Sequence, residues 1–287
     1  MVADAGLDAR DSMSTRDGGR SDSGSPMLDA RIDSPDADRA DSGVPVVDSG
    51  ASPDAGATAE PDAAPSACAC EGLPGSWRCL RAFNRCATTV WLEAQGNETP
   101  AGALDGRTEL APGACRAIAI ETLEAGRLWG NTGCEDGRCD TEPGTTPVTL
   151  AELTLGELDF YDLSLVDGFN LPMSLAPVEG TFERAGGGAF DCGAPACAVD
   201  LNVACPAELA YRPDDGPTLA CLSGCTALGT DALCCRGAHS TPETCPPSDY
   251  SRFFKDACPD AYSYAYDDAA STYTCRGGAH YDIVFCP

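Results

Sequence analysis

Eighteen cysteines lie within 287 residues, and they constrain the fold of this chain more than any other feature. Such a number is typical of a disulfide scaffold folded in an oxidising compartment. Zinc sites would be another use for many thiols, but the only histidines are His239 and His280, and no repeated CxxC pair occurs. We therefore expect paired cysteines, no metal site and no other cofactor. Oxidised cysteines also exclude Cys–His catalysis.

The first 67 residues differ in composition from the rest of the chain. They contain thirteen Asp, one Glu and five Arg, and the first aromatic residue of the chain is Trp77. Repeated Asp-Ala, Asp-Ser and Ser-Pro steps leave too little apolar surface to offset the entropy of ordering. The irregular spacing of the acids does not fit a calcium-binding loop. Residues 1–67 are therefore predicted to be a disordered acidic linker.

The other 220 residues carry a net charge of −18 out of the total of −27. A polyanionic surface disfavours nucleic acids and anionic membranes as partners. No apolar run reaches the roughly 18 residues of a membrane span. The amino terminus, Met-Val-Ala-Asp-Ala-Gly, lacks the charged and apolar regions of a signal peptide. Because the cysteines indicate export, we expect an export signal upstream of this start and a linker that separates a cell-surface anchor from the domain.

Short β-type segments dominate the cysteine-containing region. Val90–Leu92 and Ala117–Ile120 are apolar runs bounded by Gly, Pro or Asn, which predicts strands. Leu150–Leu155 and Asp162–Val166 alternate polar with apolar residues, as half-buried strands do. The dipeptide Asp167-Gly168 predicts a turn after the second of them.

Helical periodicity is confined to one segment. Ser248 is a suitable N-cap for a helix that ends near Ala257, in which Phe253, Phe254 and Ala257 would face inward. The pattern as a whole predicts a mainly β fold, a β-sandwich followed by a loop-rich, cross-linked subdomain.

Several segments resemble the thaumatin-like family in order and spacing. The most specific is Asp167-Gly-Phe-Asn-Leu-Pro-Met173, and Gly126-Arg-Leu-Trp-Gly-Asn-Thr-Gly-Cys134 is similar to another family segment. Further matches are 83–91, 150–152, 159–166, 197–206, 225–235, 250–268 and 284–287. The resemblance covers about residues 80–287. It implies one domain at 68–287, with a β-sandwich at about 80–180 and 259–287 and a disulfide-rich lobe at about 190–258.

The resemblance also implies a disulfide pattern. It pairs Cys86 with Cys286, Cys134 with Cys139, Cys192 with Cys275, Cys197 with Cys258, Cys205 with Cys221, Cys225 with Cys234, and Cys235 with Cys245. Each bridge is expected to stabilise the fold by roughly 2–4 kcal/mol, chiefly by restricting the unfolded chain.

The sequence departs from the family pattern in two places. After Cys139 it lacks the usual Gly-Asp-Cys, so a small loop is shortened and one bridge is lost. Conversely, Cys68, Cys70, Cys79 and Cys115 have no family counterpart and permit two more bridges in three combinations. A bridge between Cys79 and Cys115 would join neighbouring early strands.

By the same resemblance, an arginine and four acids of an interdomain cleft fall on Arg127, Glu152, Asp162, Asp167 and Asp268. In the family this cleft is associated with binding of β-1,3-glucans and, in some members, with their weak hydrolysis. Hydrolysis requires one protonated and one ionised carboxyl group. We expect Glu152 to be the acid and Asp167 the nucleophile or base, while the other three residues bind the ligand.

These residues also have purely structural interpretations. Asp167 is a favourable turn residue whatever the function, and Arg127 could simply tie two strands together through Asp162. The aromatic residues nearby could stack on sugars, but we expect Phe160 and Phe169 in the core.

The predicted function is that of an exported, monomeric protein that binds β-1,3-glucan or another neutral polysaccharide. Whether it also has weak endo-β-1,3-glucanase activity is left open by the sequence. Two alternatives remain: a membrane-perturbing or inhibitory defence protein, and a structural cell-surface domain with an inert cleft.

Overall fold

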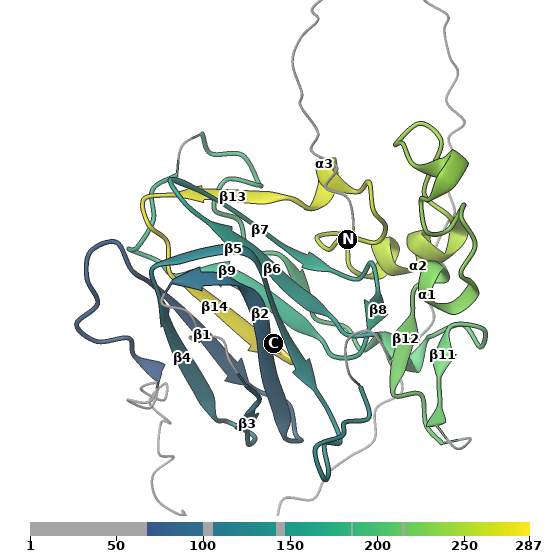
Figure 1. The fold of residues 1–287 in the computed structure, drawn as a ribbon, viewed down its shortest axis with the longest axis horizontal. Coiled ribbons are helices and arrows are strands. Elements are labelled where there is room, and N and C mark those ends of the chain that lie inside the picture. The colour runs from purple at the N-terminus through teal and green to yellow at the C-terminus, as the bar shows by residue number, and fades with distance from the viewer. Residues whose placement is uncertain (1–67, 100–105, 142–146, 185, 214–215) are drawn as a thin grey trace, which may run out of the picture. The chain divides into compact units, whose positions relative to one another are not determined.

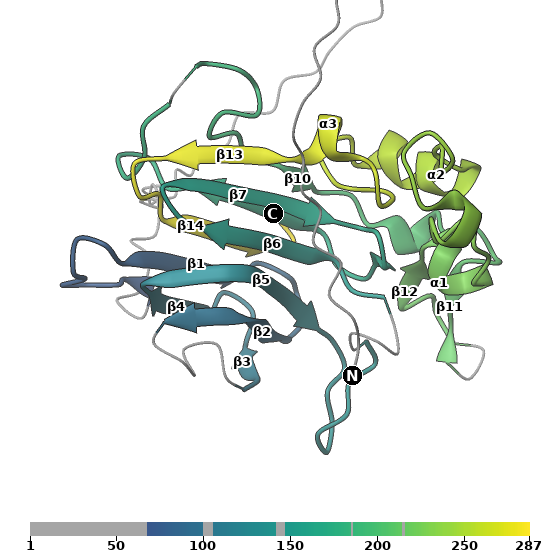
Figure 2. The same ribbon diagram turned by 45° about the horizontal axis from the view of Figure 1, so that its top comes forward.

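The computed structural model describes residues 68–99, 106–141, 147–184, 186–213 and 216–287. The acidic linker predicted at 1–67 lies outside these residues. Within the described residues the fold is mainly β, as predicted, and two large sheets lie face to face with a lobe at one end that contains α1 and α2 (Figures 1 and 2).

The six-stranded sheet carries the side chains discussed below. Its order is β13 (Tyr273–Arg276), β7 (Leu158–Ser164), β6 (Leu150–Leu155), β5 (Thr122–Asn131), β2 (Val90–Thr99) and β3 (Thr108–Leu110). The predicted strand at 150–155 is confirmed, and that at 162–166 begins four residues earlier and ends at Ser164.

The five-stranded sheet has the order β10 (Ala196–Cys197), β9 (Met173–Pro177), β14 (Tyr281–Phe285), β1 (Arg78–Asn84) and β4 (Cys115–Ile120). Strand β14 is parallel to β1 and antiparallel to β9. Leu80 and Ile283 of this sheet and Leu153 and Leu163 of the other are fully or almost fully buried in one apolar core. The alternation of apolar residues along these strands therefore produces the sandwich.

The lobe is built from short elements. A three-stranded sheet has the order β11 (Ala210–Tyr211), β12 (Ala220–Leu222) and β8 (Gly168–Phe169), and the helical segments are η2 (Leu201–Val203), α1 (Gly224–Leu228), η4 (Gly237–His239) and α2 (Asp249–Ala257). The short helix α3 (Asp268–Ser271) directly precedes β13 of the sandwich. Helix α2 confirms the predicted helix, because the Ser248 side chain accepts a hydrogen bond from Ser251 N and Phe254 is fully buried.

Strand β8 attaches the lobe to the sandwich. Gly168 pairs with Leu222 of β12 at a φ of 128°, and a Cβ at Gly168 would collide with the carbonyl oxygen of Cys221. Only glycine combines this backbone angle with this close approach. The glycine of the Asp-Gly-Phe-Asn segment is thus required by the junction between the two parts of the fold.

A buried carboxyl group links the two large sheets. Asp159 of β7 is fully buried and accepts hydrogen bonds from Tyr281 Oη of β14 and from Gly156 N, each at 2.9 Å. Burial raises the pKa of Asp159, although these two hydrogen bonds and the charge of Arg78 oppose the shift.

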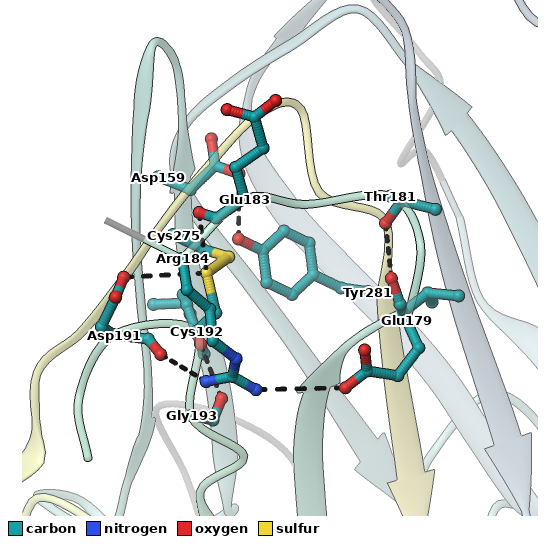
Figure 3. The surroundings of a disulfide bond; sticks show 12 residues. Asp159, Glu179, Thr181, Glu183, Arg184, Asp191, Cys192, Gly193, Cys275 and Tyr281 are labelled. Atoms are coloured by element: carbon teal, nitrogen blue, oxygen red, sulfur yellow. Dashed lines mark hydrogen bonds and ion pairs between the residues drawn. A yellow bond between two sulfur atoms is a disulfide. The ribbon is translucent and has the colours of Figure 1, made fainter. Parts of the chain in front are cut away.

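The described cysteines form nine disulfides and leave no free thiol among them. The seven pairs implied by the resemblance are all present. Figure 3 shows Cys192–Cys275, which ties β13 to the loop before β10; beside it, Arg184 donates a 2.7 Å hydrogen bond to the backbone oxygen of Asp191.

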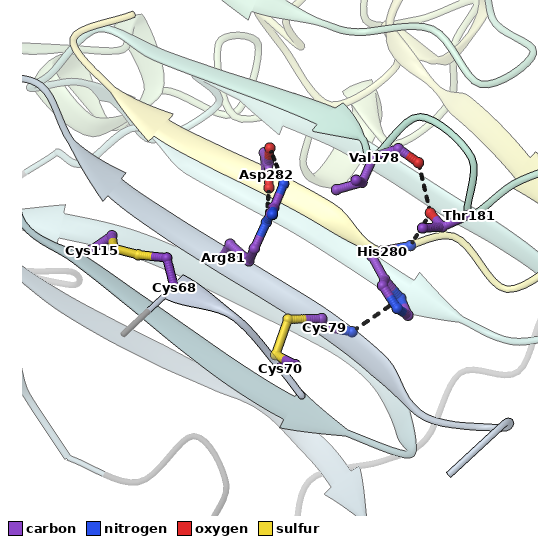
Figure 4. A network of polar contacts seen from close by, with 9 residues as sticks. All are labelled: Cys68, Cys70, Cys79, Arg81, Cys115, Val178, Thr181, His280 and Asp282. Carbon is purple, nitrogen blue, oxygen red and sulfur yellow. Dashed lines mark hydrogen bonds and ion pairs between the residues drawn. A yellow bond between two sulfur atoms is a disulfide. The ribbon is translucent and has the colours of Figure 1, made fainter. Parts of the chain in front are cut away.

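The four additional cysteines pair as Cys68–Cys115 and Cys70–Cys79 (Figure 4). The expected bridge between Cys79 and Cys115 is therefore wrong. In the antiparallel pairing of β1 with β4, Cys79 lies opposite Ala119, whereas Cys115 lies opposite Phe83. Four residues of offset correspond to about 13 Å along a strand, which is beyond the reach of a disulfide.

Candidate functional site

Three ionisable side chains lie in one row across the exposed face of the six-stranded sheet. Arg127 of β5 pairs with Glu152 of β6, and Glu152 pairs in turn with Asp162 of β7. Residues directly opposite on neighbouring strands have Cβ atoms about 4.5–5.5 Å apart, so Glu152 has Arg127 on one side and Asp162 on the other as its nearest neighbours in the row. The strand register thus brings together residues separated by up to 35 positions in the sequence.

Arg127 and Glu152 form an ion pair, with Nε and Oε1 2.8 Å apart and the two side chains 55% and 28% exposed. An open groove runs along this row. Its lining consists of Ala125, Gly126, Arg127, Glu152, Leu153, Thr154 and Asp162. The groove is therefore polar and accessible, and it contains both signs of charge.

Asp162 is the member of the row with a strongly shifted pKa. Burial, followed by repulsion from Glu152 and Asp268, raises the pKa of Asp162 to about 8 against the attraction of Arg127. Its Oδ1 atom is buried and has no hydrogen-bond partner in the described part of the chain. Near neutral pH the row therefore combines a largely protonated carboxyl group with the ion pair of Arg127 and Glu152.

This titration is expected to make stability depend on pH. The pKa of Asp162 rises on folding from 3.8 to about 8, so the folded state binds this proton more tightly, and its stability decreases as the pH rises through that interval. We expect Asp162→Asn to be more stable than the wild type by about 1–2 kcal/mol near pH 8.5 and equally stable near pH 4.

Thermal unfolding across this range measures the effect. The exposed acid Asp256 of α2 provides the control Asp256→Asn, which removes one negative charge away from the row. A difference between Asp162→Asn and wild type that stays constant with pH would contradict the raised pKa.

Asp268 reaches the row from the other side of β7. It is the first residue of α3, and its Oδ1 accepts a 2.9 Å hydrogen bond from Tyr262 Oη. Tyr262 also hydrogen-bonds Thr272 Oγ1, and its backbone pairs with Ser164 at the end of β7. The negative charge of Asp268 contributes to the raised pKa of Asp162. Four of the five cleft residues implied by the resemblance thus interact electrostatically.

Asp167 is placed differently. It is exposed in the turn after β7 and is not among the residues that line the groove. Its backbone oxygen accepts hydrogen bonds from Thr226 Oγ1 at 2.9 Å and from Ser223 N at 3.3 Å, both at the start of α1. These contacts join the sandwich to the lobe, and the role of the Asp167 side chain as nucleophile or base stays a prediction.

The aromatic residues near the acids divide into two groups. Phe169 is fully buried, as expected, and Tyr161 is 1% exposed, with its hydroxyl donating to Gly193 O. Phe160 is 47% exposed, so its expected place in the core is wrong. The alternation along β7 turns Asp159 and Tyr161 inward and therefore Phe160 outward.

Other kinds of site find little support in the described residues. No group of three or more His, Cys, Asp or Glu side chains there is arranged to hold a metal ion. Among the helices of the described ranges, none has both the length and the apolar character needed to span a bilayer.

Two packed sheets and nine disulfides among the described residues define a disulfide-stabilised β-sandwich protein of the kind that folds in oxidising compartments. The chain belongs to the thaumatin family, whose family model matches residues 84–287.

Curated relatives agree with this assignment. Pathogenesis-related protein 5 of Arabidopsis thaliana is 48% identical over 221 residues, covering 71% of this chain and 88% of that protein. A Prunus avium protein named glucan endo-1,3-beta-glucosidase is 41% identical over 224 residues, with the same two coverages of 71% and 88%.

A solved structure has a similar fold. The laminaripentaose-producing beta-1,3-glucanase, in complex with laminaritetraose, matches with a TM-score of 0.50 and 13% identity, covering 75% of this chain and 99% of that one. At this identity the likeness concerns the fold alone.

Proposed function

We propose that this protein binds β-1,3-glucan in the groove formed by Arg127, Glu152 and Asp162. The observation that carries the proposal is the row of these three side chains along an accessible groove. Carboxyl and guanidinium groups at fixed spacing hydrogen-bond the hydroxyls of a neutral sugar. A neutral polymer is also not repelled by the net negative charge of the chain. A relative named glucan endo-1,3-beta-glucosidase supports this choice of ligand.

Weak endo-hydrolysis of the bound glucan is the second part of the proposal. The mechanism requires one protonated carboxyl group and one ionised carboxylate, about 5–5.5 Å apart in retaining enzymes. The raised pKa of Asp162 suits it to donate the proton, and Glu152, directly opposite and paired with Arg127, would carry the negative charge. The assignment made from sequence, Glu152 as acid and Asp167 as nucleophile or base, is the competing version.

Binding and turnover are tested separately. Sedimentation with insoluble β-1,3-glucan is expected to retain the wild type and to retain Arg127→Ala at least tenfold less well, since a charged hydrogen-bonding group contributes about 1.5–3 kcal/mol. Glu208→Gln, which removes an exposed acid of the lobe, is the control and is expected to bind normally. Absence of wild-type binding would leave a structural domain with an inert cleft.

Release of reducing ends from a soluble β-1,3-glucan then tests the chemistry. We expect activity in the wild type and its loss, by about 100-fold or more, in both Glu152→Gln and Asp162→Asn, while Asp167→Asn stays active. Loss in Glu152→Gln and Asp167→Asn, with an active Asp162→Asn, would instead support the assignment made from sequence.

Export completes the proposal. We infer that the protein acts outside the cell or at its surface, because nine disulfides among the described residues require an oxidising environment to form. That it acts as a monomer stays a prediction.

A further inference from the structure

Two disulfides fasten the beginning of the described region to the sandwich. Cys68 and Cys70, the first cysteines after the acidic segment 1–67, pair with Cys115 and Cys79, and each pair has its Cα atoms 5.8 Å apart. Figure 4 shows both bridges beside β1 and β4. These four cysteines are the ones that have no counterpart in the family pattern. The chain thus adds two covalent links at the point where its acidic segment joins the domain.

The bridge from Cys68 leads directly to the strand of the groove. Its partner Cys115 is the first residue of β4, and only Glu121 separates β4 from β5, which supplies Arg127 to the groove. A pull on the chain before Cys68 therefore reaches β5 through one disulfide and one strand. It bypasses a sequence separation of 47 residues, within which β1, β2 and β3 lie.

Without this bridge, tension would reach β1 first. The start of β1 is held to the neighbouring β14 by non-covalent contacts: Cys79 N donates a 3.3 Å hydrogen bond to His280 Nδ1, and Arg81 Nε lies 2.6 Å from Asp282 Oδ1 (Figure 4). Because β1 lies between β14 and β4, its removal would open the five-stranded sheet. Hydrogen bonds of a strand are individually weak and can break one after another, whereas a disulfide is a covalent bond.

We propose that the Cys68–Cys115 bridge carries tension from the acidic segment 1–67 to the groove strand β5, so that the sandwich keeps its fold when that segment and a bound ligand are pulled apart. This inference goes beyond the proposed function, because it concerns a covalent path and applies to any ligand of the groove. It also gives a use to cysteines that distinguish this chain from the family pattern.

The test is single-molecule stretching of the full-length chain between a handle at its first residue and an azide-bearing amino acid at Glu124, an exposed position of β5. In the wild type, the path from Cys68 to Glu124 runs through Cys115 and can reach about 40 Å at 3.3–3.6 Å per residue. In Cys68→Ser with Cys115→Ser, the path follows the chain through β1, β2 and β3. The Cys70–Cys79 bridge then spans 9 of the 47 residues, so the path is expected to lengthen by about 130 Å more.

Cys70→Ser with Cys79→Ser is the matched control. It removes the other additional bridge but leaves the path from Cys68 to Cys115 intact, so it is expected to stretch like the wild type. Equal lengthening in the two double variants would overturn the proposal.

The wild type also decides the question without any cysteine variant, in case Cys68→Ser with Cys115→Ser does not fold. Its contour length should exceed that of residues 1–67 by no more than about 40 Å, and a clearly larger value would overturn the proposal. Glucan takes no part in the measurement. Failure of the proposed function therefore leaves this result unaffected, and failure of the tension path leaves glucan binding unaffected.

Discussion

Replacement of both Cys86 and Cys286 by alanine is expected to lower the free energy of unfolding by about 5 kcal/mol. This bridge joins positions 200 residues apart and lies beside the parallel pairing of β1 with β14. The Cys192–Cys275 bridge provides a shorter path between Cys86 and Cys286 in the unfolded chain, but that path still contains about 120 residues. Because the stabilisation grows with the logarithm of loop length, most of it remains. Denaturant unfolding under non-reducing conditions measures the loss.

The Cys70–Cys79 bridge provides a matched comparison, because it closes a loop of only 9 residues. Its removal is expected to cost about 2–3 kcal/mol by the same relation. If the two double variants lose the same free energy of unfolding, the bridges do not stabilise the protein by restricting loops of the unfolded chain.

Asn170→Ala is expected to lower the free energy of unfolding by about 3–4 kcal/mol, because each buried donor or acceptor left without a hydrogen-bond partner costs about 1–3 kcal/mol. The Asn170 side chain is buried, accepts from Thr149 N at 2.9 Å, and donates to Gly130 O at 2.8 Å and to Thr141 Oγ1 at 3.0 Å. It therefore holds β5 and the segment before β6 at the end of the sandwich.

Asn202 provides the control for this substitution. Its side chain is half-buried and donates to the backbone oxygen of Asn170 at 2.9 Å. Asn202→Ala is expected to cost about 1 kcal/mol, since it removes a single well-formed hydrogen bond. If Asn170→Ala lowers the free energy of unfolding by no more than Asn202→Ala does, water must hydrogen-bond the buried groups that Asn170 normally pairs with.

Local patterns in the sequence were sufficient to predict much of the fold. The alternation at Leu150–Leu155 gave strand β6 with its correct ends, and Ser248 gave the start of α2 through its capping side chain. Both signals depend on neighbours within a few residues, so the sequence contains them in full. The disulfides and the charged row across the sheet required the family resemblance, because their partners lie far apart in the chain.

Other features depend on tertiary structure and could not be inferred in this way. The aromatic side chain of Phe160 favours the core by residue type, whereas the two-residue period of β7 turns it to solvent. The burial of Asp159 depends on its hydrogen-bond partner Tyr281, which lies 122 residues away and leaves no local signal in the sequence. The pairing of Cys68 and Cys70 was open because it depends on the path of a segment that runs back beside β1.

The position of β14 determines when this protein can finish folding. Strand β14 lies between β9 and β1, yet it follows both of them in the chain. A growing chain therefore presents two unpaired strand edges until Tyr281–Phe285 has been synthesised, and Cys86 lacks its native partner until Cys286 follows. Early oxidation of Cys86 with another cysteine would trap the wrong topology, and thiol–disulfide exchange is the reaction that reverses it. The yield of native protein should accordingly depend on the disulfide isomerase activity of the compartment as much as on its oxidising power.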